Sequence, residues 1–80
     1  MAAKHSYEAQ VWKYLNTELY WVVVVQDGTR PIKYYPGLHP KPKQKEVQRL
    51  SYLPGAPKWW VNRVGGSPKY RLDAAYKWSV

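Results

Sequence analysis

Basic residues stand directly beside aromatic residues at two places in this chain, Lys58-Trp59-Trp60 and Lys69-Tyr70-Arg71. Lysine and arginine neutralise phosphates and release counterions, and tyrosine or tryptophan rings stack on bases. A third basic stretch, between Lys41 and Arg49, contains no aromatic residue but lies in a proline-rich context. This combination predicts a surface that contacts nucleic acid.

The positive charge is concentrated in the middle of the chain. Thirteen Lys and Arg residues against five Asp and Glu residues give a formal net charge of +8. Residues 30–71 contain ten basic residues and one acidic residue, Glu46, so this block carries a net charge of +9. The segments on either side of it are nearly neutral. This concentration of charge indicates a single binding surface, and the alternative is a solvated surface that only keeps the protein soluble.

Several kinds of chemistry have no support in the sequence. The chain has no cysteine, which excludes disulfides and thiolate metal sites. His5 and His39 have no second ligand at a metal-binding spacing, and no nucleophile or phosphate-loop motif is present. We therefore expect no metal, no cofactor and no enzymatic activity. RNA cleavage by Lys, Arg, Tyr and His side chains is the catalytic alternative left open.

The length of 80 residues predicts a single domain, residues 1–80, with one modest core. Within it we distinguish a near-neutral helix and strand (1–29), a basic binding region (30–71) and a terminal helix (72–80). The longest apolar run, residues 19–25, is far shorter than the roughly 20 residues of a membrane helix. We expect a cytoplasmic protein, or one in the host cytoplasm if it is phage-encoded, with no membrane contact.

The first part of the chain reads as a helix followed by a hairpin. Tyr7, Val11, Tyr14 and Leu15 have helical spacing, which predicts a helix over residues 6–16 with Ser6 as its N-cap. Residues 19–26, most of them in the apolar run 19–25, predict a strand that is central or covered on both faces. Asp27-Gly28 predicts a hairpin turn into a second strand, residues 30–35, which Pro36-Gly37 would end.

The second part reads as a helix, a hairpin and a closing helix. Residues 38–43 predict an extended basic loop, and residues 44–53 a short amphipathic helix, with a strand as the alternative. Two arms, 59–64 and 69–72, flank Gly65-Gly66-Ser67-Pro68 and predict a hairpin. Residues 73–80 predict a helix with Asp73 as its N-cap. The expected fold is α+β in the order α-β-β-α-β-β-α, a winged-helix-like domain with a basic C-terminal β-hairpin.

Residues 63–78, from Arg63-Val64-Gly65-Gly66-Ser67-Pro68 to Tyr76-Lys77-Trp78, resemble the wing and closing helix of small winged-helix proteins that include phage excisionases and their MerR-like relatives. In this resemblance residues 46–50 take the place of the recognition helix, and residues 54–57 that of the link. The resemblance implies a DNA-binding protein that bends its site and sets the direction of recombination by an integrase.

We therefore predict a sequence-specific or architectural DNA-binding protein, with duplex DNA as the favoured ligand and an integrase or other large enzyme as a possible partner. The alternative is a small phage-like or accessory protein that modulates a larger host protein through its basic and aromatic surface, or by strand addition to an exposed edge at residues 21–25. The predicted DNA-binding residues are Lys41, Lys43, Lys45, Gln48, Arg49, Lys58, Trp59, Trp60, Arg63, Lys69, Tyr70 and Arg71.

Overall fold

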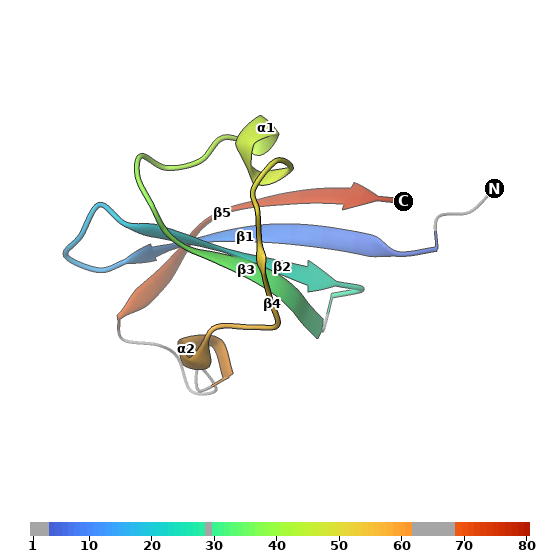
Figure 1. Cartoon of the computed structure of the whole chain (residues 1–80), viewed down its shortest axis with the longest axis horizontal. Helices are drawn as coiled ribbons and strands as arrows, with labels where there is room; N and C mark the ends of the chain where they lie inside the picture. Colours follow the sequence, from blue (N-terminus) through green and yellow to red (C-terminus); the bar gives the residue numbers. More distant parts are fainter. Residues whose placement is uncertain (1–3, 29, 62–68) are drawn as a thin grey trace.

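The computed structural model describes residues 4–28, 30–61 and 69–80, and these form one antiparallel sheet with two single-turn helices (Figure 1). The five strands lie in the order β4-β3-β2-β1-β5. The elements along the chain are β1 (Ser6–Tyr14), β2 (Tyr20–Gln26), β3 (Arg30–Leu38), α1 (Gln44–Val47), β4 (Leu53–Pro54), α2 (Lys58–Val61) and β5 (Tyr70–Ser79).

The first three strands form a meander, and the last strand returns to the start of the chain. β1 pairs with β2, β2 with β3 and β1 with β5, all antiparallel. Asp27 and Gly28, with φ of 53° and 78°, make the turn between β2 and β3, so the predicted hairpin is confirmed. β3 is longer than predicted, because Pro36-Gly37 does not end it: the register shifts there by one residue and Gly37 takes a φ of 69°.

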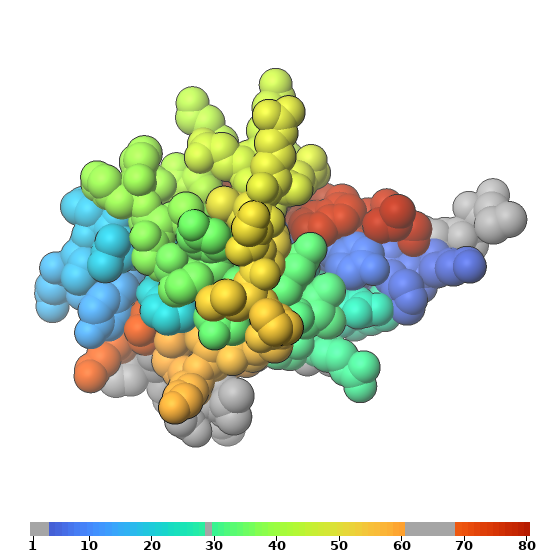
Figure 2. Space-filling view, viewed as in Figure 1, coloured from blue at the N-terminus to red at the C-terminus, as the bar shows by residue number. Residues whose placement is uncertain are grey.

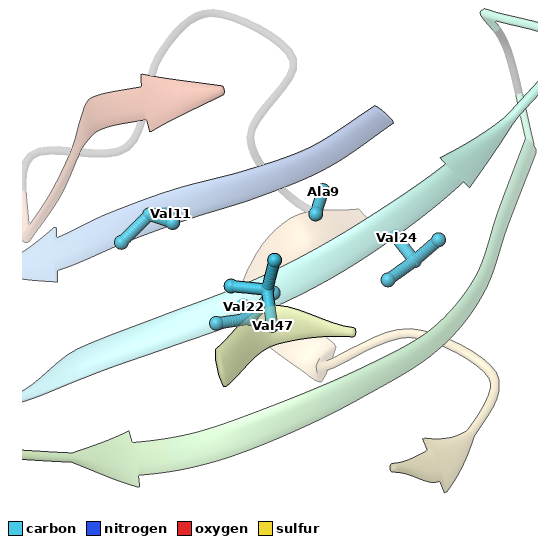
Figure 3. Close-up of a cluster of buried hydrophobic side chains, with 5 residues drawn as sticks. All are labelled: Ala9, Val11, Val22, Val24 and Val47. Atoms are coloured by element: carbon cyan, nitrogen blue, oxygen red, sulfur yellow. The ribbon is translucent and has the colours of Figure 1, made fainter. Parts of the chain in front are cut away.

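The centre of the sheet is apolar on both faces. On one face Ala9, Val11, Val22 and Val24 are fully buried beneath Val47, which α1 places over β2 (Figure 3). On the other face the side chains of Val23 and Val25 pack against Trp60 of α2. Because alternate residues of a strand point to opposite faces, four consecutive valines fill both layers. The prediction of a central strand is confirmed, and the prediction that residues 21–25 form an exposed edge is wrong.

The two terminal helices that the sequence predicted are both strands. In β1 the buried residues Ala9 and Val11 alternate with Gln10 and Trp12, and this period of two decides the structure. The helix was predicted because Tyr7 and Val11 fit the helical spacing as well as the alternating pattern. Ser6 is the first residue of β1 and does not cap a helix. In β5 the half-buried residues also alternate, and Asp73 lies at a one-residue register shift against β1.

The predicted helix over residues 44–53 is only partly correct, because α1 ends at Val47 and Leu53 belongs to β4. The predicted hairpin over residues 59–72 is wrong where the structure describes it. Residues 58–61 form a helix, and the arm that begins at Tyr70 pairs with β1. The predicted turn at residues 65–68 lies outside the described residues.

The winged-helix-like α+β fold is therefore a wrong prediction, since the described residues form a mostly β domain with two helices of four residues each. α1 and α2 lie on opposite sides of the sheet, and the chain between them passes β3, with which β4 pairs (Figure 1). Neither helix of the described ranges has the length and apolar composition needed to cross a membrane.

Candidate nucleic-acid interface

The segment around α1 displays its polar side chains because two apolar residues anchor it. Pro42 and Val47 are buried, and the five predicted contact residues around them are all exposed. The turn is held by the backbone N–H of Lys43, which donates to the Glu46 carboxylate at 3.3 Å, and by the Val47 N–H, which donates to the Lys43 carbonyl at 3.1 Å. In Figure 2 this green to yellow part of the chain forms a continuous surface across the upper part of the view. It brings together Lys41, Lys43, Lys45, Gln48 and Arg49.

Lys41 forms an ion pair with an acidic residue of β5. Its Nζ lies 2.6 Å from the Asp73 carboxylate, at the register shift of β5. The ammonium holds the pKa of the Asp73 carboxyl below its ordinary value, with smaller contributions from Arg71 and Lys13, and the carboxylate raises the pKa of Lys41. This pair ties the basic segment to the edge of the sheet.

The pair makes stability depend on pH in a defined direction. Because the Asp73 pKa is lower in the folded than in the unfolded chain, its contribution is present above the ordinary pKa of 3.8 and is lost as pH falls through the folded value. We expect Asp73→Asn to lower the urea midpoint at pH 7 and to leave it unchanged at pH 2. Glu18→Gln, which removes another exposed carboxylate, is the control. An equal effect of Asp73→Asn at both pH values would contradict the role of the ion pair.

A shallow groove of about 400 Å³ lies beside α1 on the same side of the sheet. The Lys33 ammonium lies 4.8 Å from the centre of the Tyr52 ring, and the Tyr52 hydroxyl donates to the Val47 carbonyl. Burial raises the pKa of Tyr52 to about 12, so this hydroxyl stays protonated at neutral pH. On the other wall Trp78 is half-buried and stacks on Tyr7, with the ring centres 5.4 Å apart. The groove is lined by Lys33, Val47, Gln48, Tyr52, Trp78, Ser79 and Val80.

The sequence did not identify Lys33, Tyr52 and Trp78 as site residues. They lie on β3, before β4 and on β5, and only the sheet brings them together. The available signal was the position of Tyr52 off the apolar line of residues 47, 50 and 53, which predicts a ring outside the main core. Such a signal does not say what the ring faces.

The aromatic residues predicted to stack on bases lie on the opposite side of the sheet. Trp59 stacks on Tyr70 with ring centres 4.0 Å apart, and Trp60 meets the ring of Trp12 edge-on at 5.7 Å. Trp60 is only 7% exposed. These rings contact one another and the valines of β2 and so form a second core layer. Lys58, at the start of α2, is exposed on this side.

Lys69 and Arg71 were predicted as parts of a wing, and they lie in the turn before β5 and on β5. Lys69 is exposed in the turn before β5, and its carbonyl accepts from the Leu15 N–H at 2.7 Å. Arg71 is exposed and pairs in register with Lys13 on β1. Arg63 lies outside the described residues.

The histidines form no metal site with the acids in the described part of the chain, where no group of three His, Cys, Asp or Glu residues is arranged to hold an ion. His5 Nδ1 lies 3.0 Å from the Asp27 carboxylate, and this contact lowers the pKa of Asp27. The His39 ring hydrogen-bonds the Glu18 carbonyl at 3.1 Å. Both histidines therefore contact turns of the sheet.

Comparison of the chain with protein-family models, with curated proteins and with solved structures returned no match in any of the three.

Proposed function

We propose that this protein binds single-stranded nucleic acid across the α1 side of its sheet. The observation that carries the proposal is the groove, where two half-buried aromatic rings, a lysine and a glutamine line one hollow beside the exposed basic segment. In this proposal a base of an unpaired strand enters the groove and stacks on Tyr52 or Trp78, and such stacking contributes about 1–3 kcal/mol. Gln48 supplies amide donors and an acceptor for the edge of the base.

The phosphates on either side of that base would lie along the exposed basic segment. Lys43, Lys45 and Arg49 are exposed and within a few residues of Gln48, which lines the groove. Lys33 lies over the Tyr52 ring and belongs to the lining of the same hollow. Cations around an aromatic platform are the arrangement that single-strand binding requires.

The single helical turn of α1 weighs against the duplex that the sequence predicted. A recognition helix reads several successive base pairs with side chains from two or more turns, and α1 has four residues. The recombination role depended on a winged helix and is not part of this proposal. That the chain is not an enzyme stays a prediction.

The test is the salt dependence of binding to three ligands of equal length. Fluorescence anisotropy with a labelled thymidine decamer, a uridine RNA decamer and a ten-base-pair duplex gives the affinity at 50–300 mM salt. We expect a decamer to bind more tightly than the duplex and log K to fall with log salt at about −0.7 per phosphate contacted. Absence of binding at 50 mM salt, or binding that salt does not weaken, would overturn the proposal.

The Trp78 ring supplies a second readout for the same titration, because it lines the groove. A base stacked on Trp78 is expected to quench its fluorescence. Trp78→Phe keeps an aromatic ring next to Tyr7 and removes this signal, so the quench attributable to the groove is the difference between the two proteins. A quench of the same size in the variant would place the base elsewhere.

A further inference from the structure

β5 forms one edge of the sheet over its whole length of ten residues. It pairs with β1 on its inner side, and within the ranges 4–28, 30–61 and 69–80 no strand pairs with its outer side. β4, at the opposite edge, has only two residues. An unpaired edge presents a row of backbone N–H and C=O groups that can accept another strand. β5 is therefore the long edge that the described chain leaves open.

The backbone groups that point outward can be identified. Val80 exchanges hydrogen bonds with His5, since its N–H donates to the His5 carbonyl at 3.0 Å and its carbonyl accepts from the His5 N–H at 3.1 Å. Inward and outward groups alternate along an antiparallel strand. The backbone groups of Trp78, Tyr76 and Ala74 therefore face β1. Those that face outward belong to Ala75, Lys77 and Ser79.

The regular part of this edge has few of the features that prevent strand addition. Proline, bulges and charged residues are the usual protections. The register shift at Asp73 protects only the first part of β5, and residues 74–79 continue in one register with β1. Within them Lys77 is the one charged residue and no proline is present. The three outward residues of this segment thus offer an added strand three backbone N–H donors and three C=O acceptors.

Hollows border the end of this edge. One is the groove beside α1, and the other, of about 450 Å³, is lined by residues of β1 and β5 and by Gly28. Trp78 and Ser79 line both. Strand addition places alternate side chains of the added segment on opposite faces of the sheet, and pockets beside the edge give such binding its specificity.

The positive charge of the protein favours an acidic partner at this edge. The Lys77 side chain is 78% exposed, with its ammonium 3.8 Å from the Glu8 carboxylate. Arg71 lies near the start of the strand, and Lys41, from the segment before α1, pairs with Asp73 of the strand. A second copy of this chain would bring another net charge of +8 against the edge. Like charges oppose pairing and opposite charges favour it.

We propose that the outer edge of β5, at residues 74–79, binds an extended acidic segment of a partner protein by antiparallel or parallel strand addition. The argument for this site does not rest on the proposed nucleic-acid binding, although the groove beside α1 adjoins both sites.

The first test measures hydrogen exchange of individual amides by NMR, in the free protein and with an eight-residue peptide, Glu-Val-Glu-Thr-Glu-Val-Glu-Thr. The outward amides of Ala75, Lys77 and Ser79 are expected to exchange fast in the free protein and at least about tenfold more slowly with saturating peptide. The inward amides of Ala74, Tyr76 and Trp78 are protected in both states. Protection of the outward amides that is already present in the free protein and rises with protein concentration would show a second copy on this edge and overturn the proposal.

The second test separates backbone pairing from charge. An N-methyl group on every second residue of the same peptide keeps its charge and side chains but removes the backbone donors along one edge. Because either edge of the peptide can pair with β5, we compare two isomers, methylated on the odd and on the even residues. At least one of the two is expected to bind about tenfold more weakly than the parent peptide. Equal affinity of all three peptides would mean that charge alone holds the acidic segment, and would overturn strand addition.

A third test changes the protein instead of the peptide. Lys77→Pro removes an outward donor and leaves the groups that face β1 in place, whereas Lys77→Ala removes the same charge and keeps the donor. We expect the proline variant to lose at least about tenfold more affinity than the alanine variant. If the two variants lose the same affinity while circular dichroism shows both folded, the outward N–H of residue 77 takes no part. If the proline variant does not fold, the exchange measurement on the unchanged protein decides.

Discussion

Replacing Trp60 with alanine is expected to lower the free energy of unfolding by about 3–5 kcal/mol, the usual range for a buried tryptophan. Trp60 is 7% exposed and packs against Val23 and Val25, with the ring of Trp12 edge-on at 5.7 Å. A domain of this size has a total stability of only about 5–12 kcal/mol. The variant should therefore be largely unfolded at modest urea concentrations, as measured by circular dichroism at 25 °C.

The control for this change is Leu53→Ala, which truncates a side chain that is 47% exposed. It should alter stability by no more than about 0.5–1 kcal/mol. The sequence analysis predicted a different role for Trp60, that of a ring that stacks on bases. A Trp60→Ala protein that keeps its stability and loses its affinity for nucleic acid would restore that role and would contradict the assignment of α2 to the core.

The double variant Lys45→Ala/Arg49→Ala is expected to bind a thymidine decamer about 25-fold more weakly than the unchanged protein at 0.1 M salt. Both side chains are exposed on the α1 side, next to the groove. If each contacts one phosphate of a single strand, the slope of log K against log salt should become less steep by about 1.4. Anisotropy titrations at four salt concentrations measure both quantities.

The matched control is Lys58→Ala/Lys77→Ala, which removes the same charge from other exposed positions, on α2 and on β5. Both variants have a net charge lowered by two, so a purely long-range electrostatic effect would weaken binding equally in the two. We expect the control to change the affinity by no more than about threefold and the slope by little. Equal losses in both variants would mean that binding follows net charge and that the α1 side is not the interface.

The hairpin around Asp27-Gly28 could be predicted from the sequence because its signals are local. The turn residues determine the conformation of the turn, and four successive valines have only one reasonable place, in the middle of a sheet. The terminal segments lack such local signals. Residues 6–16 carry a pattern that fits a helix as well as a strand, and the choice is made by pairing with β2 on one side and β5 on the other.

The candidate site could be predicted only in part, for a related reason. The exposed basic residues around α1 are close in sequence, so charge counting found them. Trp59 and Tyr70 were predicted as base contacts because aromatic residues beside basic ones are common in nucleic-acid interfaces. The same rings are equally suited to a core that contains no phenylalanine, and the sheet uses them there. Composition alone does not distinguish these two uses.

The placement of the five tryptophans has a consequence for spectroscopy. Trp12, Trp21, Trp59 and Trp60 lie within one network of ring contacts 5.3–6.2 Å apart on the α2 side, and Trp78 stacks on Tyr7 on the α1 side. Indoles this close couple their electronic transitions, so the near-ultraviolet circular dichroism of the four should report the packing of the fold as a group. The emission of Trp78 should respond to what enters the groove. The tryptophans thus supply two signals without an added label: circular dichroism for folding and fluorescence for occupancy of the groove.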